Sequence, residues 1–74
     1  MSQEKDIIDR IASRVKTLRK AQKLTQLDLA VKSDIDPRQI QRIEAGKHDT
    51  GIRTLDKVAR AFGMSLSDFF DFGK

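Results

Sequence analysis

The sequence predicts an all-α protein built from five short helices. Apolar residues recur at spacings of three and four along most of the chain, and the strict alternation typical of a half-buried β-strand is absent. Capping and turn residues divide this pattern into five segments. A chain of 74 residues is long enough for one domain at most, so we expect residues 1–74 to form a single compact domain with a small core.

The first helix is predicted from about Lys5 to Gln22. Its apolar residues fall on one stripe, as in a helix that packs against a core: Ile8, Ile11, Val15, Leu18 and Ala21. The stretch from Arg10 to Leu27 holds six basic residues and no acidic one. Together with a net charge of +4 and an isoelectric point of about 9.8, this distribution indicates a polyanionic partner and predicts one electropositive side.

The second helix is predicted to begin at Gln26. Thr25 followed three residues later by Asp28 resembles a capping box, in which each residue satisfies a backbone N–H of the other. The apolar residues expected to be buried in varying degree are Leu27, Leu29 and Ala30.

The third helix has the sharpest boundaries in the chain. Asp36 is an N-cap residue, Pro37 suits the first helical position, and Gln39 completes a capping-box pattern. Gly46 favours the left-handed backbone that often follows a helix, so we expect the third helix to run from Pro37 to Ala45.

Two further helices are predicted near the end of the sequence. The fourth runs from about Arg53 to Phe62 and stops at Gly63. The fifth is short and is capped by Ser65 and Asp68. Its apolar residues are Leu66, Phe69 and Phe70.

The link between the second and third helices, Lys32–Asp36, is so short that the two helices must meet at a sharp angle. This is the helix-turn-helix pattern, here over about residues 25–45. The apolar residues expected to converge are Leu29, Ala30, Ile35, Ile40 and Ile43. With Ile40 directed inward, Arg38 and Arg42 project outward one turn apart, between the glutamines Gln39 and Gln41. Arginine and glutamine on an exposed helix face suit the DNA major groove.

The chain resembles the Cro and lambda-repressor type of helix-turn-helix family over about Ile8 to Phe70. The residues that carry the resemblance are Arg19, Leu24-Thr25-Gln26-Leu27-Asp28-Leu29-Ala30, Ile40-Gln41-Arg42-Ile43-Glu44-Ala45-Gly46-Lys47, Leu55 and Val58-Ala59-Arg60-Ala61-Phe62-Gly63. The resemblance implies a lambda-repressor-like fold, a DNA-binding regulator, and an internal ion pair between Arg19 and Glu44. It also implies that Gln26, at the start of the second helix, holds a DNA phosphate.

Two positions depart from the family pattern. Asp34 stands where many relatives have glycine in the turn, so we expect a positive φ at Asp34. Pro37 stands where some phage repressors use a glutamine to read a base. Because Pro37 can make only apolar contact, for example with a thymine methyl group, base reading is expected to shift onto Arg38 and Arg42.

The expected DNA contacts fall into two groups. Residues that contact bases are expected to be Arg38, Arg42, Gln39 and Pro37, although Gln39 could instead be used in capping. Residues that contact phosphates are expected to be Gln26, Thr25, Arg19, Lys47 and His48, with simple exposure in a loop as the alternative for the last two.

These features predict a transcriptional regulator that represses by binding a palindromic operator as a homodimer. We expect the dimer to form through the region around the fifth helix, and the protein to act in a prokaryotic cytoplasm on the nucleoid, since residues 1–6 lack a signal peptide's apolar region. The alternative is the DNA-binding antitoxin of a toxin–antitoxin pair, or another module that contacts a protein.

An enzyme, a metal site, a cofactor and a membrane span are not expected. The chain has no cysteine and no tyrosine, and its single histidine, His48, lies in a predicted loop. A lone histidine cannot complete a zinc site, and it leaves no plausible pair of nucleophile and base. The longest apolar stretches are far too short to cross a bilayer.

Overall fold

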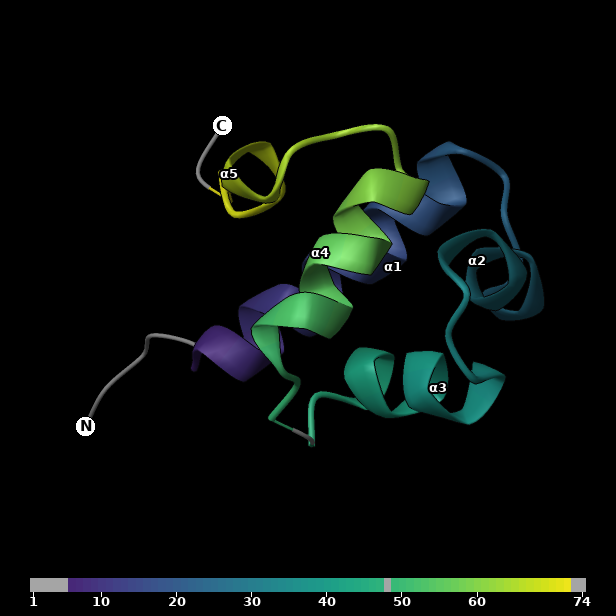
Figure 1. The fold of residues 1–74 in the computed structure, drawn as a ribbon. Coiled ribbons are helices and arrows are strands. Elements are labelled where there is room, and N and C mark those ends of the chain that lie inside the picture. Colours follow the sequence, from purple (N-terminus) through teal and green to yellow (C-terminus); the bar gives the residue numbers. More distant parts are fainter. Residues whose placement is uncertain (1–5, 48, 73–74) are drawn as a thin grey trace.

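The structure is a computed structural model that describes residues 6–47 and 49–72. Within these ranges the chain forms five helices and no strand, as predicted (Figure 1). The helices are α1 (Ile7–Ala21), α2 (Gln26–Ser33), α3 (Pro37–Ala45), α4 (Ile52–Ala61) and α5 (Leu66–Phe69). The predicted start of the first helix at Lys5 lies outside the described residues. The second helix ends at Ser33, two residues later than the predicted link Lys32–Asp36 allowed, and the other predicted boundaries agree to within one residue.

The helix starts are held by short-range caps. The predicted capping box of α2 is confirmed: Thr25 Oγ1 accepts from the Asp28 N–H, and Asp28 Oδ2 accepts from the Thr25 N–H, each at 2.9 Å. At α3 the predicted capping box with Gln39 is wrong. The Asp36 carboxylate instead accepts from the backbone N–H of Arg38, one residue earlier, at 2.8 Å. Gln39 is therefore not used in this cap.

Three helices end in the same way, with one residue in the left-handed conformation. The next residue then donates its N–H to a carbonyl five positions back, as in a Schellman motif. The left-handed residues are Lys23 (φ 60°) after α1, Asp34 (φ 59°) after α2 and Gly63 (φ 80°) after α4. The positive φ predicted for Asp34 is confirmed. Lys23 also has a positive φ, which the sequence did not predict.

One hydrophobic core joins all five helices. Its largest fully buried side chains are Val15 of α1, Leu29 of α2, Ile40 and Ile43 of α3, Val58 of α4 and Phe69 of α5. Of the residues predicted to converge, Leu29, Ala30, Ile40 and Ile43 are buried and Ile35 is partly buried. The expected burial of Leu27 is wrong, because Leu27 lies about 200° around α2 from Leu29 and faces outward.

Arg14 of α1 and Gln22, which directly follows α1, hold the ends of α4 and α5. Arg14 donates from Nε to the Phe69 carbonyl and from Nη2 to the Asp68 carbonyl, both at 2.9 Å. Gln22 Nε2 donates to the Phe62 carbonyl at 3.0 Å. The last carbonyls of a helix lack partners within the helix, so these donors stabilise the two ends and anchor both helices on α1.

Among residues 6–47 and 49–72, no helix combines the length and apolar character that crossing a bilayer demands.

Candidate nucleic-acid interface

The short connection between α2 and α3 sets the direction of α3. Asp34, at φ 59° and ψ 49°, reverses the chain, and the Ile35 N–H returns to the Ala30 carbonyl at 2.9 Å. Ala30 is almost completely buried, as are Ile40 and Ile43 on the facing side of α3. Because this side of α3 is packed against the core, the opposite side must face solvent.

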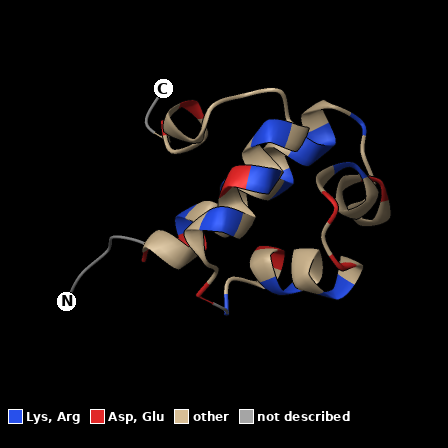
Figure 2. Ribbon diagram, viewed as in Figure 1, with Lys and Arg blue, Asp and Glu red and all other residues tan. Residues whose placement is uncertain are grey.

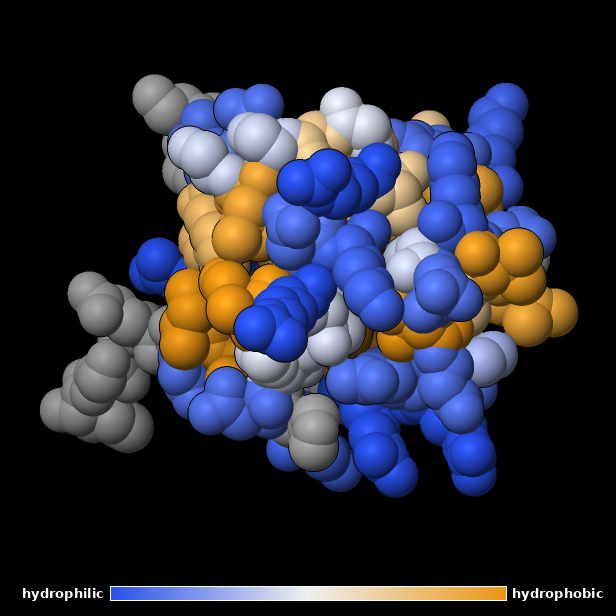
Figure 3. All heavy atoms as spheres, viewed as in Figure 1, coloured by the Kyte–Doolittle hydropathy of each residue, from blue (hydrophilic) through white to orange (hydrophobic). Residues whose placement is uncertain are grey.

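That exposed side carries the predicted base-reading residues. Arg38, Gln41 and Arg42 are exposed, as is Pro37, while Gln39 is half-buried. The cations of α3 lie along its outer edge (Figure 2), and strongly hydrophilic side chains project from the same edge (Figure 3). The prediction that Arg38 and Arg42 point away from the core is therefore confirmed.

Asp36 engages Arg38 through its side chain as well as through the cap. Arg38 Nε lies 3.4 Å from Asp36 Oδ1, and Arg38 Nη2 lies 3.3 Å from Asp36 Oδ2. The hydrogen bonds from the Arg38 side chain and backbone hold the pKa of Asp36 below its usual range. Sequence reasoning assigned Asp36 only to capping, although an aspartate two residues before an arginine could have indicated the contact.

The predicted ion pair between Arg19 and Glu44 is confirmed. Arg19 Nε lies 2.7 Å from Glu44 Oε2, and Arg19 Nη2 lies 3.1 Å from Glu44 Oε1. Arg19 Nη1 donates to the Leu24 carbonyl at 2.9 Å. Glu44 Oε1 also accepts from Gln26 Nε2 at 3.2 Å, a contact that was not predicted. These bonds join the ends of α1 and α3 to the start of α2, so they hold the helix-turn-helix at one angle.

The residues predicted to hold phosphate differ in how available they are. The Arg19 side chain is only 14% exposed and uses three of its N–H groups internally, and the Gln26 amide donates to Glu44. Thr25 and Lys47 are exposed, and Lys47 directly follows the end of α3. His48 lies outside the described residues. The phosphate contacts of all five residues stay predictions.

Cations are not confined to one side of the molecule. Figure 2 shows lysine and arginine on α4 as well as on α1 and α3. Arg14 is one of the six basic residues between Arg10 and Leu27, and its side chain holds α5 through hydrogen bonds. The expectation of one electropositive side was therefore too simple, because helical periodicity distributes a run of basic residues around its helix.

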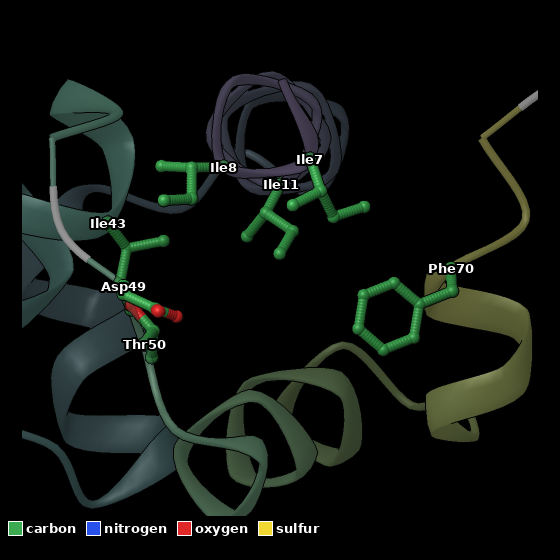
Figure 4. A pocket seen from close by; sticks show the side chains of 7 residues that line it. All are labelled: Ile7, Ile8, Ile11, Ile43, Asp49, Thr50 and Phe70. Carbon is green, nitrogen blue, oxygen red and sulfur yellow. The ribbon is translucent and has the colours of Figure 1, made fainter. Parts of the chain in front are cut away.

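A second surface feature lies where α1 begins. Ile7, the first residue of α1, is more than half exposed although it is large and apolar. Beside Ile7 is a small open hollow lined mainly by apolar side chains, in which Ile7 and Ile11 of α1 face Phe70 (Figure 4). This surface borders α5, the region expected to form a dimer.

Sequence comparison places relatives of this chain among transcriptional regulators. It is 35% identical over 57 residues to an immunity repressor of Bacillus phage phi105, covering 77% of this chain and 40% of the repressor. It is 36% identical over 58 residues to a helix-turn-helix transcriptional regulator of Methanocaldococcus jannaschii, covering 78% and 88% of the two chains. It is 33% identical over 66 residues to the control protein C.MunI of a Mycoplasma species, covering 88% and 89%.

The fold is also similar to that of a solved controller protein. The restriction-modification controller C.Esp1396I, crystallised as a tetramer with its natural 35-base-pair operator, superposes with a TM-score of 0.83 at 28% identity. The match covers 92% of this chain and 90% of the controller. Residues 15–69 match the family described as Helix-turn-helix, and these residues include the α2–α3 motif and most of the core. The chain therefore belongs to the helix-turn-helix family of the Cro and lambda-repressor type.

Proposed function

We propose that this protein is a transcriptional regulator, not an enzyme, and that it represses by binding a specific operator with α3 in the major groove. The observation that carries the proposal is the exposure of Arg38 and Arg42 on a helix whose other side is fixed by Ile40 and Ile43. A helix fixed by the core, with two exposed arginine side chains one turn apart, suits the edges of guanine bases. A phage repressor and two controller proteins of similar sequence or fold support this assignment.

The contacts divide by chemistry. Arg38 and Arg42 read bases, the half-buried Gln39 assists at the same edge, and Pro37 offers only apolar contact. Lys47 neutralises a phosphate beside the end of α3. The polar groups of Thr25 and Gln26 approach a phosphate at the start of α2, and His48 extends the phosphate contacts past Lys47. Arg19 contributes mainly through its ion pair with Glu44, which fixes the orientation of α3.

A second copy of this chain completes the operator-binding unit. We place the dimer contact on the apolar hollow beside α5, where Ile7 and Phe70 are available to pack across a two-fold axis. A single short recognition helix covers few base pairs, whereas a dimer reads two half-sites about 34 Å apart. In a prokaryotic cell such a regulator acts in the cytoplasm, on nucleoid DNA, with residues 1–74 as its DNA-binding domain.

The test separates base reading from phosphate binding. Operator sequences are first selected from a random DNA pool, and binding of wild type, Arg42→Ala and Lys47→Ala is then measured on selected and scrambled duplexes over a salt series. Arg42→Ala should weaken binding to the selected duplex by about 1–3 kcal/mol and flatten the preference at one position of each half-site. Lys47→Ala should weaken binding to both duplexes and lower the salt slope by about one contact per protomer.

Arg60→Ala is the matched control. Arg60 is an exposed arginine of α4 that pairs with Asp56, away from α3, and its loss should leave the ratio of the two affinities unchanged. If wild type binds both duplexes equally, or neither, the proposed function is wrong and the protein-interaction alternative takes its place.

A further inference from the structure

The charge of Asp36 is more than its capping position requires. The cap needs one oxygen that accepts from the Arg38 N–H, and asparagine, serine or threonine supplies this about equally well. A carboxylate at the start of a helix that faces DNA also repels phosphate. The pair with Arg38 lies at the surface, with the arginine side chain 82% exposed, so it adds little to stability. The charge therefore matters more for DNA binding than for stability.

The contact occupies one edge of the guanidinium group. Asp36 takes the Nε and Nη2 side of Arg38, and no contact within the described residues occupies the Nη1 side. A guanidinium is a rigid planar fork, so fixing one edge directs the free N–H groups. An arginine held in this way loses less side-chain entropy when it meets a base. Its charge is also partly cancelled, so its attraction to any nearby phosphate is weaker.

We propose that Asp36 is a positioning residue: it directs Arg38 toward a base edge and limits its binding to phosphates of unrelated DNA. Asp36 thereby raises the ratio of specific to nonspecific affinity and lowers nonspecific affinity itself. This inference rests on the proposed function, in which Arg38 reads a base.

The test variant is Asp36→Asn. Asparagine keeps the capping oxygen and removes the charge, so α3 should stay folded, which circular dichroism and thermal unfolding will verify. Asp34→Asn is the matched control. It removes the same charge two residues away, asparagine tolerates the left-handed backbone of Asp34, and no contact joins Asp34 to Arg38 in the structure. Any general effect of lost negative charge appears equally in both variants.

Affinities for the selected and scrambled duplexes are measured over a salt series. Relative to Asp34→Asn, Asp36→Asn should bind scrambled DNA more tightly, with a salt slope steeper by about 0.9, as expected for one added phosphate contact. The ratio of specific to nonspecific affinity should fall roughly fivefold or more, the lower end of what one bidentate arginine–guanine pair contributes. In an Arg38→Ala background, Asp36→Asn should leave this ratio unchanged.

Two results would overturn the inference. One is a ratio of specific to nonspecific affinity that is the same in Asp36→Asn as in Asp34→Asn. The other is a fall in this ratio that Asp36→Asn still causes when Arg38 is alanine. Either result leaves the proposed function intact as long as wild type discriminates between the duplexes and Arg42→Ala reduces that discrimination. Failure of the proposed function is recognised separately, by a wild-type protein that does not discriminate at all.

Discussion

Arg19 and Glu44 are 25 residues apart in sequence and form a two-point ion pair, with N–O distances of 2.7 and 3.1 Å. The Glu44 side chain is 4% exposed and that of Arg19 is 14% exposed. A charge in such a place costs free energy unless its partner is present. The pair therefore makes the end of α3 dependent on the end of α1.

Replacing Glu44 with glutamine should lower the free energy of unfolding by about 3 kcal/mol, because the partly buried Arg19 charge loses its counter-charge. Urea denaturation followed by circular dichroism measures this. Asp56→Asn breaks the exposed pair with Arg60 and is the control, with an expected cost below about 0.5 kcal/mol. Equal costs for the two variants would show that the Arg19–Glu44 pair is effectively solvated.

The left-handed residues Lys23 and Asp34 should both gain from replacement by glycine. A positive φ strains lysine sterically, whereas aspartate tolerates it better. Lys23→Gly should therefore stabilise the protein by up to about 1 kcal/mol, and Asp34→Gly by a few tenths of a kcal/mol. Thermal and urea unfolding of each variant check this order. A loss of stability in Lys23→Gly would mean that its side chain contributes contacts larger than the backbone cost.

Two glycines with positive φ should respond differently to alanine. A Cβ at Gly63 meets nothing within 4 Å, so Gly63→Ala should cost only the conformational penalty, about 1 kcal/mol. A Cβ at Gly46 would lie 3.0 Å from Asp9 Oδ1 and 3.6 Å from Ala12 Cβ, where α3 ends against α1. Gly46→Ala should therefore cost more than Gly63→Ala in the same unfolding assay, and also weaken operator binding. Equal costs would indicate that α1 moves aside freely.

The capping carboxylate of Asp28 should make stability sensitive to acid. Hydrogen bonds from the Thr25 backbone and hydroxyl lower the pKa of Asp28 in the folded protein. The stabilisation is complete above the unfolded pKa of about 4 and is lost as pH falls below it through the folded value. Asp28→Asn should lose less stability than wild type when urea midpoints are compared between about pH 5 and pH 2. Parallel curves would contradict this role for Asp28.

Much of the fold could be predicted because its signals are local. Helix starts are set by residues close in sequence, such as the capping box of Thr25 and Asp28 and the proline at the start of α3. These boundaries can therefore be predicted without knowledge of the tertiary contacts. The outward direction of Arg38 and Arg42 follows from the burial of Ile40 by the same periodicity. The Arg19–Glu44 pair was predicted only through resemblance to a family.

Other features depended on contacts between distant parts of the chain. The outward face of α2, with Leu27 and with Val31 at 75% exposure, reflects which side the core already covers. Arg14 and Lys16 are both basic residues of α1, but only Arg14 meets the carbonyls of α5, because only its side of the helix faces α5. The sequence by itself determined which segments are helical and which residues of α3 face outward, since those depend on bonds and periodicity within a few residues. The tertiary structure decided which charged side chains stay free for DNA, since pairing such as that of Gln26 with Glu44 requires helices brought together by the core.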